Sequence, residues 1–135
     1  MNDSKPSSFT RTDEEWKKEL PPETFSVMRK HGTERAGTSP LNKEHRAGMY
    51  ACASCGLSLF ESTAKFDSGT GWPSFFAPLP KAVGTSTDAS LGMARTEVHC
   101  ARCGGHLGHV FPDGPKPTGE RYCMNGVALR FEPAP

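Results

Sequence analysis

Near the N-terminus the spacing of apolar residues predicts two short helices. Thr12 and Glu15 stand three positions apart before an apolar residue, a pattern typical of the capping box that begins a helix. This first helix carries Trp16 and ends at the prolines at positions 21–22. The second of these prolines can open another helix through Phe25, Val27 and Met28.

Beyond these helices the apolar pattern is that of short strands separated by turns. Short strand-like runs are interrupted by glycine and proline at intervals close to those of an all-β domain. The predicted strands cover residues 45–51, 57–60, 83–87, 95–99, 109–111, 122–124 and 127–131. We therefore expect a mainly β fold.

The composition narrows the domain organisation. A chain of 135 residues is long enough for one ordinary domain, which we expect over residues 10–133, behind a disordered tail of residues 1–9. With 14 glycines, 12 prolines and only 35% apolar residues, the chain has many turns around a modest core. A structural metal would stabilise such a core.

Charge and hydropathy exclude several classes of partner. The 16 basic and 15 acidic residues leave a formal charge of +1, which argues against nucleic acid or an anionic membrane as the main partner. No apolar run approaches the roughly 20 residues of a membrane span, and residues 1–6 do not form a signal peptide. We expect a cytoplasmic protein with reduced thiols, in which cysteines serve metal binding or catalysis.

The five cysteines divide into two matched pairs and one single residue. Cys52-x-x-Cys55 and Cys100-x-x-Cys103 are each followed directly by a glycine, which permits the tight turn that brings two thiolates to one ion. Two such pairs are a usual source of a closed four-cysteine zinc site, which has a structural role. Buried unligated thiols or a redox pair are the alternative, disfavoured by the matching glycines.

Cys123 remains as the candidate for chemistry. If its segment is a strand, Arg121, Cys123 and Asn125 share one face, while Tyr122 and Met124 point into the core. A thiol beside a cation and an amide is well placed to ionise. A lone cysteine is equally consistent with a small buried apolar residue.

Two histidines lie close to this segment in the chain. On a regular strand His106 and His109 would fall on opposite faces, but Gly104, Gly105 and Gly108 favour an irregular turn that could aim both rings into one pocket. A histidine there could donate a proton beside a thiolate. Surface histidines are the alternative, and two histidines are too few for a second closed zinc site.

An aromatic cluster and a loop complete the candidate site. Trp72 lies in a turn-prone stretch between Gly71 and Pro73, and its indole could form one wall of a small apolar pocket. By position alone, an ordinary core tryptophan is at least as consistent. The loop of residues 112–119 could form the rim of the site.

Three motifs in this order closely resemble methionine sulfoxide reductase B. They are GWPSF at residues 71–75, CGGHLGHVF at 103–111 and RYCMN at 121–125, and the resemblance extends over residues 16–131, including both cysteine pairs. It implies reduction of the R epimer of methionine sulfoxide, free or in oxidised proteins. It also implies two antiparallel β-sheets in a tent- or barrel-like arrangement, short N-terminal helices and one structural zinc ion.

The resemblance assigns a role to each candidate residue. Cys123 matches the nucleophile of the family, Arg121 the residue that assists the thiolate, and Trp72 the wall that receives the methyl group of the substrate. The polar pocket of the family is matched by His106, His109 and Asn125. Attack by the Cys123 thiolate would leave a sulfenic acid after methionine departs.

The chain departs from the commonest pattern of that family at Thr70. Many relatives carry there a cysteine that forms a disulfide with the oxidised nucleophile, whereas this chain has no spare cysteine. We expect a monomer whose Cys123 is regenerated by thioredoxin or a small-molecule thiol. The main rival from another class is a non-catalytic zinc-ribbon binding module; a general thiol oxidoreductase using one Cys-x-x-Cys pair is a second.

Overall fold

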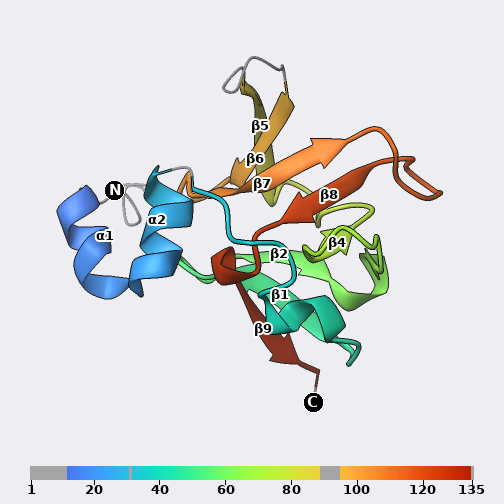
Figure 1. Cartoon of the computed structure of the whole chain (residues 1–135), viewed down its shortest axis with the longest axis horizontal. Helices are drawn as coiled ribbons and strands as arrows, with labels where there is room; N and C mark the ends of the chain where they lie inside the picture. The colour runs from blue at the N-terminus through green and yellow to red at the C-terminus, as the bar shows by residue number, and fades with distance from the viewer. Residues whose placement is uncertain (1–11, 31, 89–94, 135) are drawn as a thin grey trace.

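The computed structural model describes residues 12–30, 32–88 and 95–134 (Figure 1). This part of the chain contains two short helices followed by two antiparallel sheets, so the predicted mainly β class is confirmed. The predicted disordered tail, residues 1–9, lies outside the described residues.

The helices begin where the capping pattern predicts. The first, α1 (Asp13–Glu19), opens with a reciprocal box in which the Glu15 amide donates to Thr12 Oγ1 at 3.2 Å and the Thr12 amide donates to Glu15 Oε1 at 2.8 Å. The second, α2 (Pro22–Lys30), buries Val27 and Met28. Neither of these helices, nor any other in the described ranges, has the length and apolar character needed to cross a bilayer.

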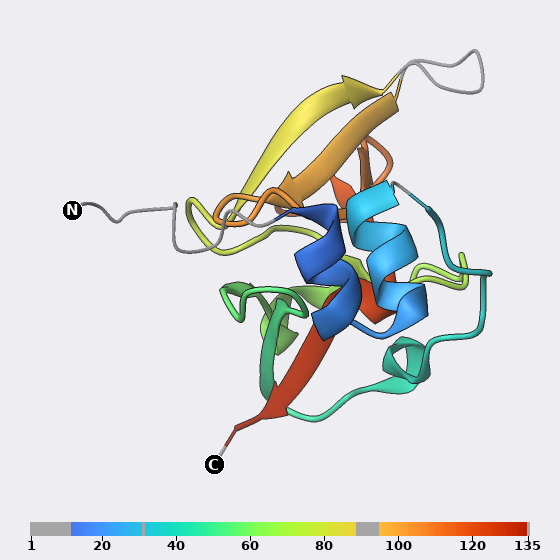
Figure 2. The same cartoon turned by 90° about the vertical axis from the view of Figure 1, so that its left-hand side faces the viewer.

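The strands form a smaller and a larger sheet. The smaller has the order β2 (Ser58–Glu61), β1 (Gly48–Cys52), β9 (Leu129–Pro133). The larger has the order β3 (Lys65–Phe66), β4 (Ser74–Phe75), β8 (Arg121–Met124), β7 (His106–Phe111), β6 (Arg95–Cys100), β5 (Val83–Asp88). Figure 2 shows the two helices side by side, with β5 and β6 above them and β1 and β9 below.

The observed strands differ from the prediction mainly at short segments. The last strand begins at Leu129, because a 3-10 turn, η5 (Gly126–Ala128), occupies the residues before it. Strand β7 begins at His106, earlier than predicted, and β3 and β4 were not predicted at all. Two-residue strands carry no periodic signal, so only their pairing with neighbours reveals them.

An aromatic cluster joins the two sheets. Phe60 on β2 stacks on Phe75 of β4 with ring centroids 4.3 Å apart, and Tyr50 on β1 meets Phe75 edge-on at 5.0 Å. All three side chains are fully buried, and burial raises the pKa of Tyr50 to about 12. Ser74, next to Phe75 on β4, pairs with Cys123 on β8, so this packing also fixes the strand that carries Cys123.

Candidate functional site

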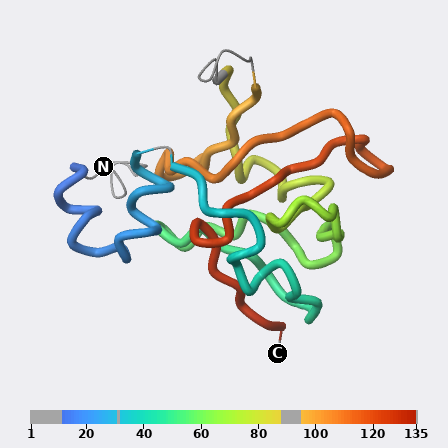
Figure 3. Tube along the Cα trace, viewed as in Figure 1, coloured from blue at the N-terminus to red at the C-terminus, as the bar shows by residue number. Residues whose placement is uncertain are grey.

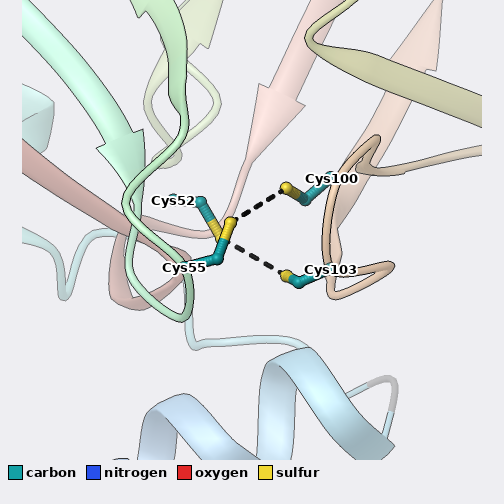
Figure 4. A group of neighbouring side chains, drawn as sticks. All are labelled: Cys52, Cys55, Cys100 and Cys103. Atoms are coloured by element: carbon teal, nitrogen blue, oxygen red, sulfur yellow. Dashed lines mark hydrogen bonds between the residues drawn. The ribbon is translucent and has the colours of Figure 1, made fainter. Parts of the chain in front are cut away.

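The two cysteine pairs converge on one point between the sheets (Figure 4). Cys52 ends β1 of the smaller sheet and Cys100 ends β6 of the larger one. The Sγ atoms of Cys52 and Cys103 lie 3.7 Å apart, those of Cys55 and Cys100 lie 3.6 Å apart, and all four fall within 4.8 Å of one another. A tetrahedral ion with bonds to sulfur of about 2.3 Å would separate its ligands by about 3.8 Å. The four cysteines can therefore hold one metal ion.

Each cysteine pair is shaped by the glycine that follows it. Gly56 and Gly104 have φ angles of 82° and 76°, a region that favours glycine. Their amides donate to the carbonyls of Cys52 and Cys100 at 2.8 and 2.9 Å and close the two turns. The same turn is thus built twice, which explains why both pairs present their thiols in the same way.

Two arginines support the thiolate cluster. Arg29 of α2 donates to Cys103 Sγ and to the Cys103 carbonyl, both at 3.1 Å, and Arg102 donates to the Cys55 carbonyl at 2.8 Å. Hydrogen bonding from the Cys100 and Cys52 thiols lowers the pKa of Cys103 below its usual value. Four thiolates around a divalent ion would carry a net charge of about −2, which these guanidinium groups would stabilise.

Cys123 lies apart from this cluster, in a pocket of about 270 Å³ on the larger sheet. A volume this small suits one side chain, since small-molecule sites generally run from about 300 to 1,000 Å³. Of the predicted catalytic and substrate-binding residues, five line the pocket: Trp72, His109, Arg121, Cys123 and Asn125. The pocket also includes Thr33, Thr70, Arg95, Gly108 and Phe111.

Strand register places the polar groups of the site in one row. Glu97 on β6 pairs with His109 on β7, His109 pairs with Cys123 on β8, and Cys123 pairs with Ser74 on β4. Directly paired residues share a face of the sheet. The row therefore runs across four strands, which hold the thiol and one histidine close together.

A β-bulge brings the second histidine to the same face. Val98 pairs with Gly108 but His99 pairs with His106, so β7 has one extra residue at this point. The extra residue reverses the alternation, and the rings of His106 and His109 lie 5.4 Å apart in a T-shaped arrangement. His106 is buried and lies outside the pocket lining, behind His109. The irregularity expected from the glycines is thus a bulge within a strand.

Glu97 is a part of the site that the sequence did not reveal. Its buried carboxylate accepts from His106 Nδ1 at 2.9 Å, from His99 Nδ1 at 3.1 Å and from Ser86 Oγ at 2.9 Å. Burial alone would raise the pKa of Glu97, but these hydrogen bonds outweigh it and hold the pKa below its usual range. Alternation in residues 95–99 places Glu97 and His99 on the same face of the strand, opposite Val98, but it gives no sign that Glu97 is buried.

Arg121 is held beside Cys123 by groups on both sides. Asp113, from the loop predicted as the rim, accepts from Arg121 Nε at 3.0 Å and from its terminal nitrogen at 3.2 Å. The guanidinium carbon lies 4.5 Å from the centre of the Phe111 ring. Hydrogen bonding to Asp113 and, to a lesser extent, interaction with Cys123 raise the pKa of Arg121. The cation stays charged next to the thiol.

The hydroxyl of Thr70 lies against the Cys123 thiol. Its Oγ1 lies 3.8 Å from Cys123 Sγ and 2.8 Å from Ser68 Oγ, which in turn lies 2.8 Å from Ser74 Oγ. A short chain of hydroxyls therefore ends at Cys123. The position at which the sequence departs from the commonest motif is in direct contact with the candidate nucleophile.

Comparison with known proteins gives consistent matches over most of the chain. The SelR domain family matches residues 20–133. A peptide methionine sulfoxide reductase MsrB of Leifsonia xyli is 58% identical over 93% of this chain and 91% of its own length. A protein of the same description from Agrobacterium fabrum is 51% identical over 98% of this chain and 99% of its own length, and one from Pseudomonas putida is 57% identical over 91% and 93%.

A solved structure shares the fold without sharing much sequence. The "Yippee-like" domain of Mis18 superposes with a TM-score of 0.54 at 16% identity, covering 67% of this chain and 99% of that chain. At this identity the likeness concerns the arrangement of the strands alone.

The cysteine cluster generates a test of metal binding. Cys100→Ser removes one of four ligands and is expected to abolish the bound ion and to lower the Tm by about 10 °C or more, because a structural metal contributes several kcal/mol to folding. Cys123→Ser is the matched control, and it should keep one ion per chain and a Tm within a few degrees of the wild type. Elemental analysis and thermal unfolding measure both, and equal metal loss in the two variants would contradict the assignment.

The Glu97 cluster generates a test of pH dependence. Because the folded protein holds the pKa of Glu97 below its usual 4.5, the ionised carboxylate stabilises the fold above that pH, and this contribution is lost as the pH falls through the folded pKa. The stability gap between wild type and Glu97→Gln should therefore narrow as the pH is lowered below 4.5. Urea midpoints of both proteins between about pH 5.5 and 3.5 measure it. A gap that stays constant or widens over this range would refute the linkage.

Proposed function

We propose that Cys123 is the nucleophile that reduces methionine sulfoxide in this chain, which belongs to the SelR domain family. The chain is a methionine sulfoxide reductase, an oxidoreductase of the MsrB type. The observation that supports Cys123 is its location. It is the one cysteine outside the metal cluster, and it lines a pocket together with an arginine, a histidine and a tryptophan.

The proposed reaction transfers one oxygen atom from substrate to enzyme. The Cys123 thiolate attacks the sulfoxide sulfur while a proton is delivered to the sulfoxide oxygen, which gives a transient sulfur–sulfur bond. The hydroxyl group then passes to Cys123 Sγ as the sulfur–oxygen and sulfur–sulfur bonds break. Methionine sulfoxide gains two electrons and leaves as methionine, while Cys123 loses two and becomes a sulfenic acid. Arg121 supports the thiolate, because its positive charge lies beside Cys123.

The proton comes from the histidine pair in this proposal. His109 lines the pocket, and His106 lies directly behind it with Nδ1 on the Glu97 carboxylate. A histidine placed beside a thiolate nucleophile is the usual acid at neutral pH. Trp72 and Asn125 complete the pocket, one as an apolar wall for the methyl group and the other as a polar contact. In this proposal the enzyme prefers the R epimer because one wall of the pocket is apolar and the other is polar.

The sulfenic acid must be reduced by a thiol from outside the chain. Thr70 occupies the position next to Cys123, and the other four cysteines belong to the metal cluster. Two equivalents of an external thiol, from thioredoxin or a small molecule, would return Cys123 to the thiol and release water and a disulfide. Oxidised proteins and free methionine sulfoxide are the proposed substrates, in a reducing compartment such as the cytoplasm.

We assign the metal as one structural zinc ion. Four cysteine ligands close the coordination sphere, and zinc is the usual ion of such sites. Cys52, Cys55, Cys100 and Cys103 would hold it, and its contribution would be to stability. A zinc-ribbon binding module accounts for this cluster but gives no role to the pocket around Cys123.

Turnover of the two sulfoxide epimers tests the proposed nucleophile. The wild type is expected to reduce the R epimer of a methionine sulfoxide substrate with at least about a hundredfold preference over the S epimer. Cys123→Ser should lose activity by about 10⁴-fold or more, because no other group can accept the oxygen. Zinc content and unfolding are measured on both proteins, so that lost activity is separated from lost structure. Equal activity in the two proteins would refute the assignment.

Mass spectrometry after a single turnover without reductant tests the fate of Cys123. The wild type is expected to carry a sulfenic acid that a dimedone-type reagent traps. Thr70→Cys should instead form an intramolecular disulfide with Cys123, because residue 70 already contacts that sulfur at 3.8 Å. An intramolecular disulfide in the wild type would show that a metal ligand resolves the intermediate, contrary to this proposal.

A further inference from the structure

Glu34 lies between two walls of the Cys123 pocket, in the extended segment that follows α2. Figure 3 shows this segment leaving α2 and crossing the turn that follows β8. The Glu34 amide donates to Asn125 Oδ1 at 2.9 Å, and the Glu34 carbonyl accepts from Trp72 Nε1 at 3.1 Å. The backbone of Glu34 thus forms a hydrogen bond with the polar group of each of these two pocket side chains.

The side chain of Glu34 is anchored to the turn beside Asn125. It is buried, and its two oxygens accept from the amides of Gly126 at 2.9 Å and Val127 at 3.1 Å. Each carboxylate oxygen therefore has its own donor. Since Gly126 directly follows Asn125, the carboxylate ties the backbone of Glu34 to the strand end that carries the amide.

The orientation of the Asn125 amide is settled by its two partners. Its Oδ1 accepts from Glu34, and its Nδ2 donates to the Leu107 carbonyl at 3.0 Å. A flipped amide would lose both hydrogen bonds. The Asn125 side chain consequently keeps one position only while the Glu34 backbone stays in place.

The Trp72 turn has little freedom to move against the same segment. The Gly37 amide donates to the Gly71 carbonyl at 2.7 Å, and Asn42 Nδ2 donates to the same carbonyl at 2.9 Å. Gly71 has a φ of 95°, and a Cβ there would lie 2.8 Å from the Cβ of Ala36. Residues 34–37 therefore pack directly against the turn that carries Trp72.

We propose that Glu34 is a positioning residue that sets the substrate pocket by holding Trp72 and Asn125 in place at the same time. The proposal rests on the function proposed above, in which these two side chains contact the substrate. Glu34 does not contact Cys123; it acts through the two residues that line the pocket. Its side chain determines where its own backbone lies, and that backbone fixes the pocket.

Kinetics of Glu34→Gln test the proposal. Glutamine keeps the size of the side chain but replaces one acceptor oxygen with a donor, so it cannot accept from both Gly126 and Val127. We expect kcat/KM to fall by about 10- to 100-fold, the loss typical of a small displacement of positioning groups. Glu34→Asp, which keeps the charge on a shorter side chain, should recover part of this loss.

Thr24→Val is the matched control. Thr24 Oγ1 donates to the Val127 carbonyl at 3.0 Å, so it anchors the same turn from α2 through a hydrogen bond that involves neither Trp72 nor Asn125. A purely structural role of Glu34 predicts that both variants lose stability and keep activity per folded, zinc-loaded molecule. A positioning role predicts loss of kcat/KM in Glu34→Gln and less than about twofold change in Thr24→Val.

A second readout does not depend on turnover. The indole N–H of Trp72 is followed by hydrogen exchange in NMR spectra, with Trp16→Phe used to assign the two tryptophan signals. Exchange of this proton should be about tenfold faster or more in Glu34→Gln than in the wild type and unchanged in Thr24→Val.

Wild-type kcat/KM together with wild-type exchange in Glu34→Gln would overturn the proposal. If Glu34→Gln does not fold, Glu34→Asp is judged by the same two criteria. If Cys123→Ser proves fully active, the proposed function fails, whereas the exchange of the Trp72 proton still tests whether Glu34 holds this side chain.

Discussion

The convergence of four thiols between the two sheets is the constraint on which the rest of the structure depends. Hydrogen bonds within a sheet fix strands relative to their neighbours but cannot fix one sheet relative to another. Here the ends of β1 and β6, which belong to different sheets, bring their cysteines within 4.8 Å. A structural zinc ion contributes about 10 kcal/mol or more in small domains, as much as the whole net stability of many proteins. The aromatic contacts of Tyr50, Phe60 and Phe75 supplement this link.

The candidate site around Cys123 is built on the larger sheet and is separate from the cluster of four cysteines. Register across β6, β7, β8 and β4 places Glu97, His109, Cys123 and Ser74 in one row, and strands hold such a row more rigidly than loops do. Arg121 adds positive charge beside the thiol and is itself held by Asp113. Under the proposed function, this separation would allow the four clustered cysteines to hold a metal ion while Cys123 reacts.

Residues outside the recognisable motifs complete this arrangement. Glu34 joins the turn after β8 to the loop of Trp72, and Glu97 joins β6 to the buried histidine. Both are buried carboxylates whose oxygens each have a donor, the condition under which such groups are tolerated in an interior. Asn125 and Gly126, two partners of Glu34, lie 91 and 92 positions away in the chain, whereas those of Glu97 are nearby residues that strand pairing brings to one face.

Local patterns in the sequence were sufficient for the elements that local physics controls. The capping box of Thr12 and Glu15, the paired cysteines with their glycines and the mainly β class follow from rules that act over a few residues, and each is present in the fold. The two-residue strands β3 and β4 and the bulge that turns His106 toward His109 exist only because neighbouring strands impose a register. The partners of Glu97 and Glu34 likewise depend on which strands and turns come to lie side by side. The sequence alone therefore determined the chemical groups, while tertiary pairing decided which of them meet, because hydrogen-bond geometry between distant segments is set only after they pack.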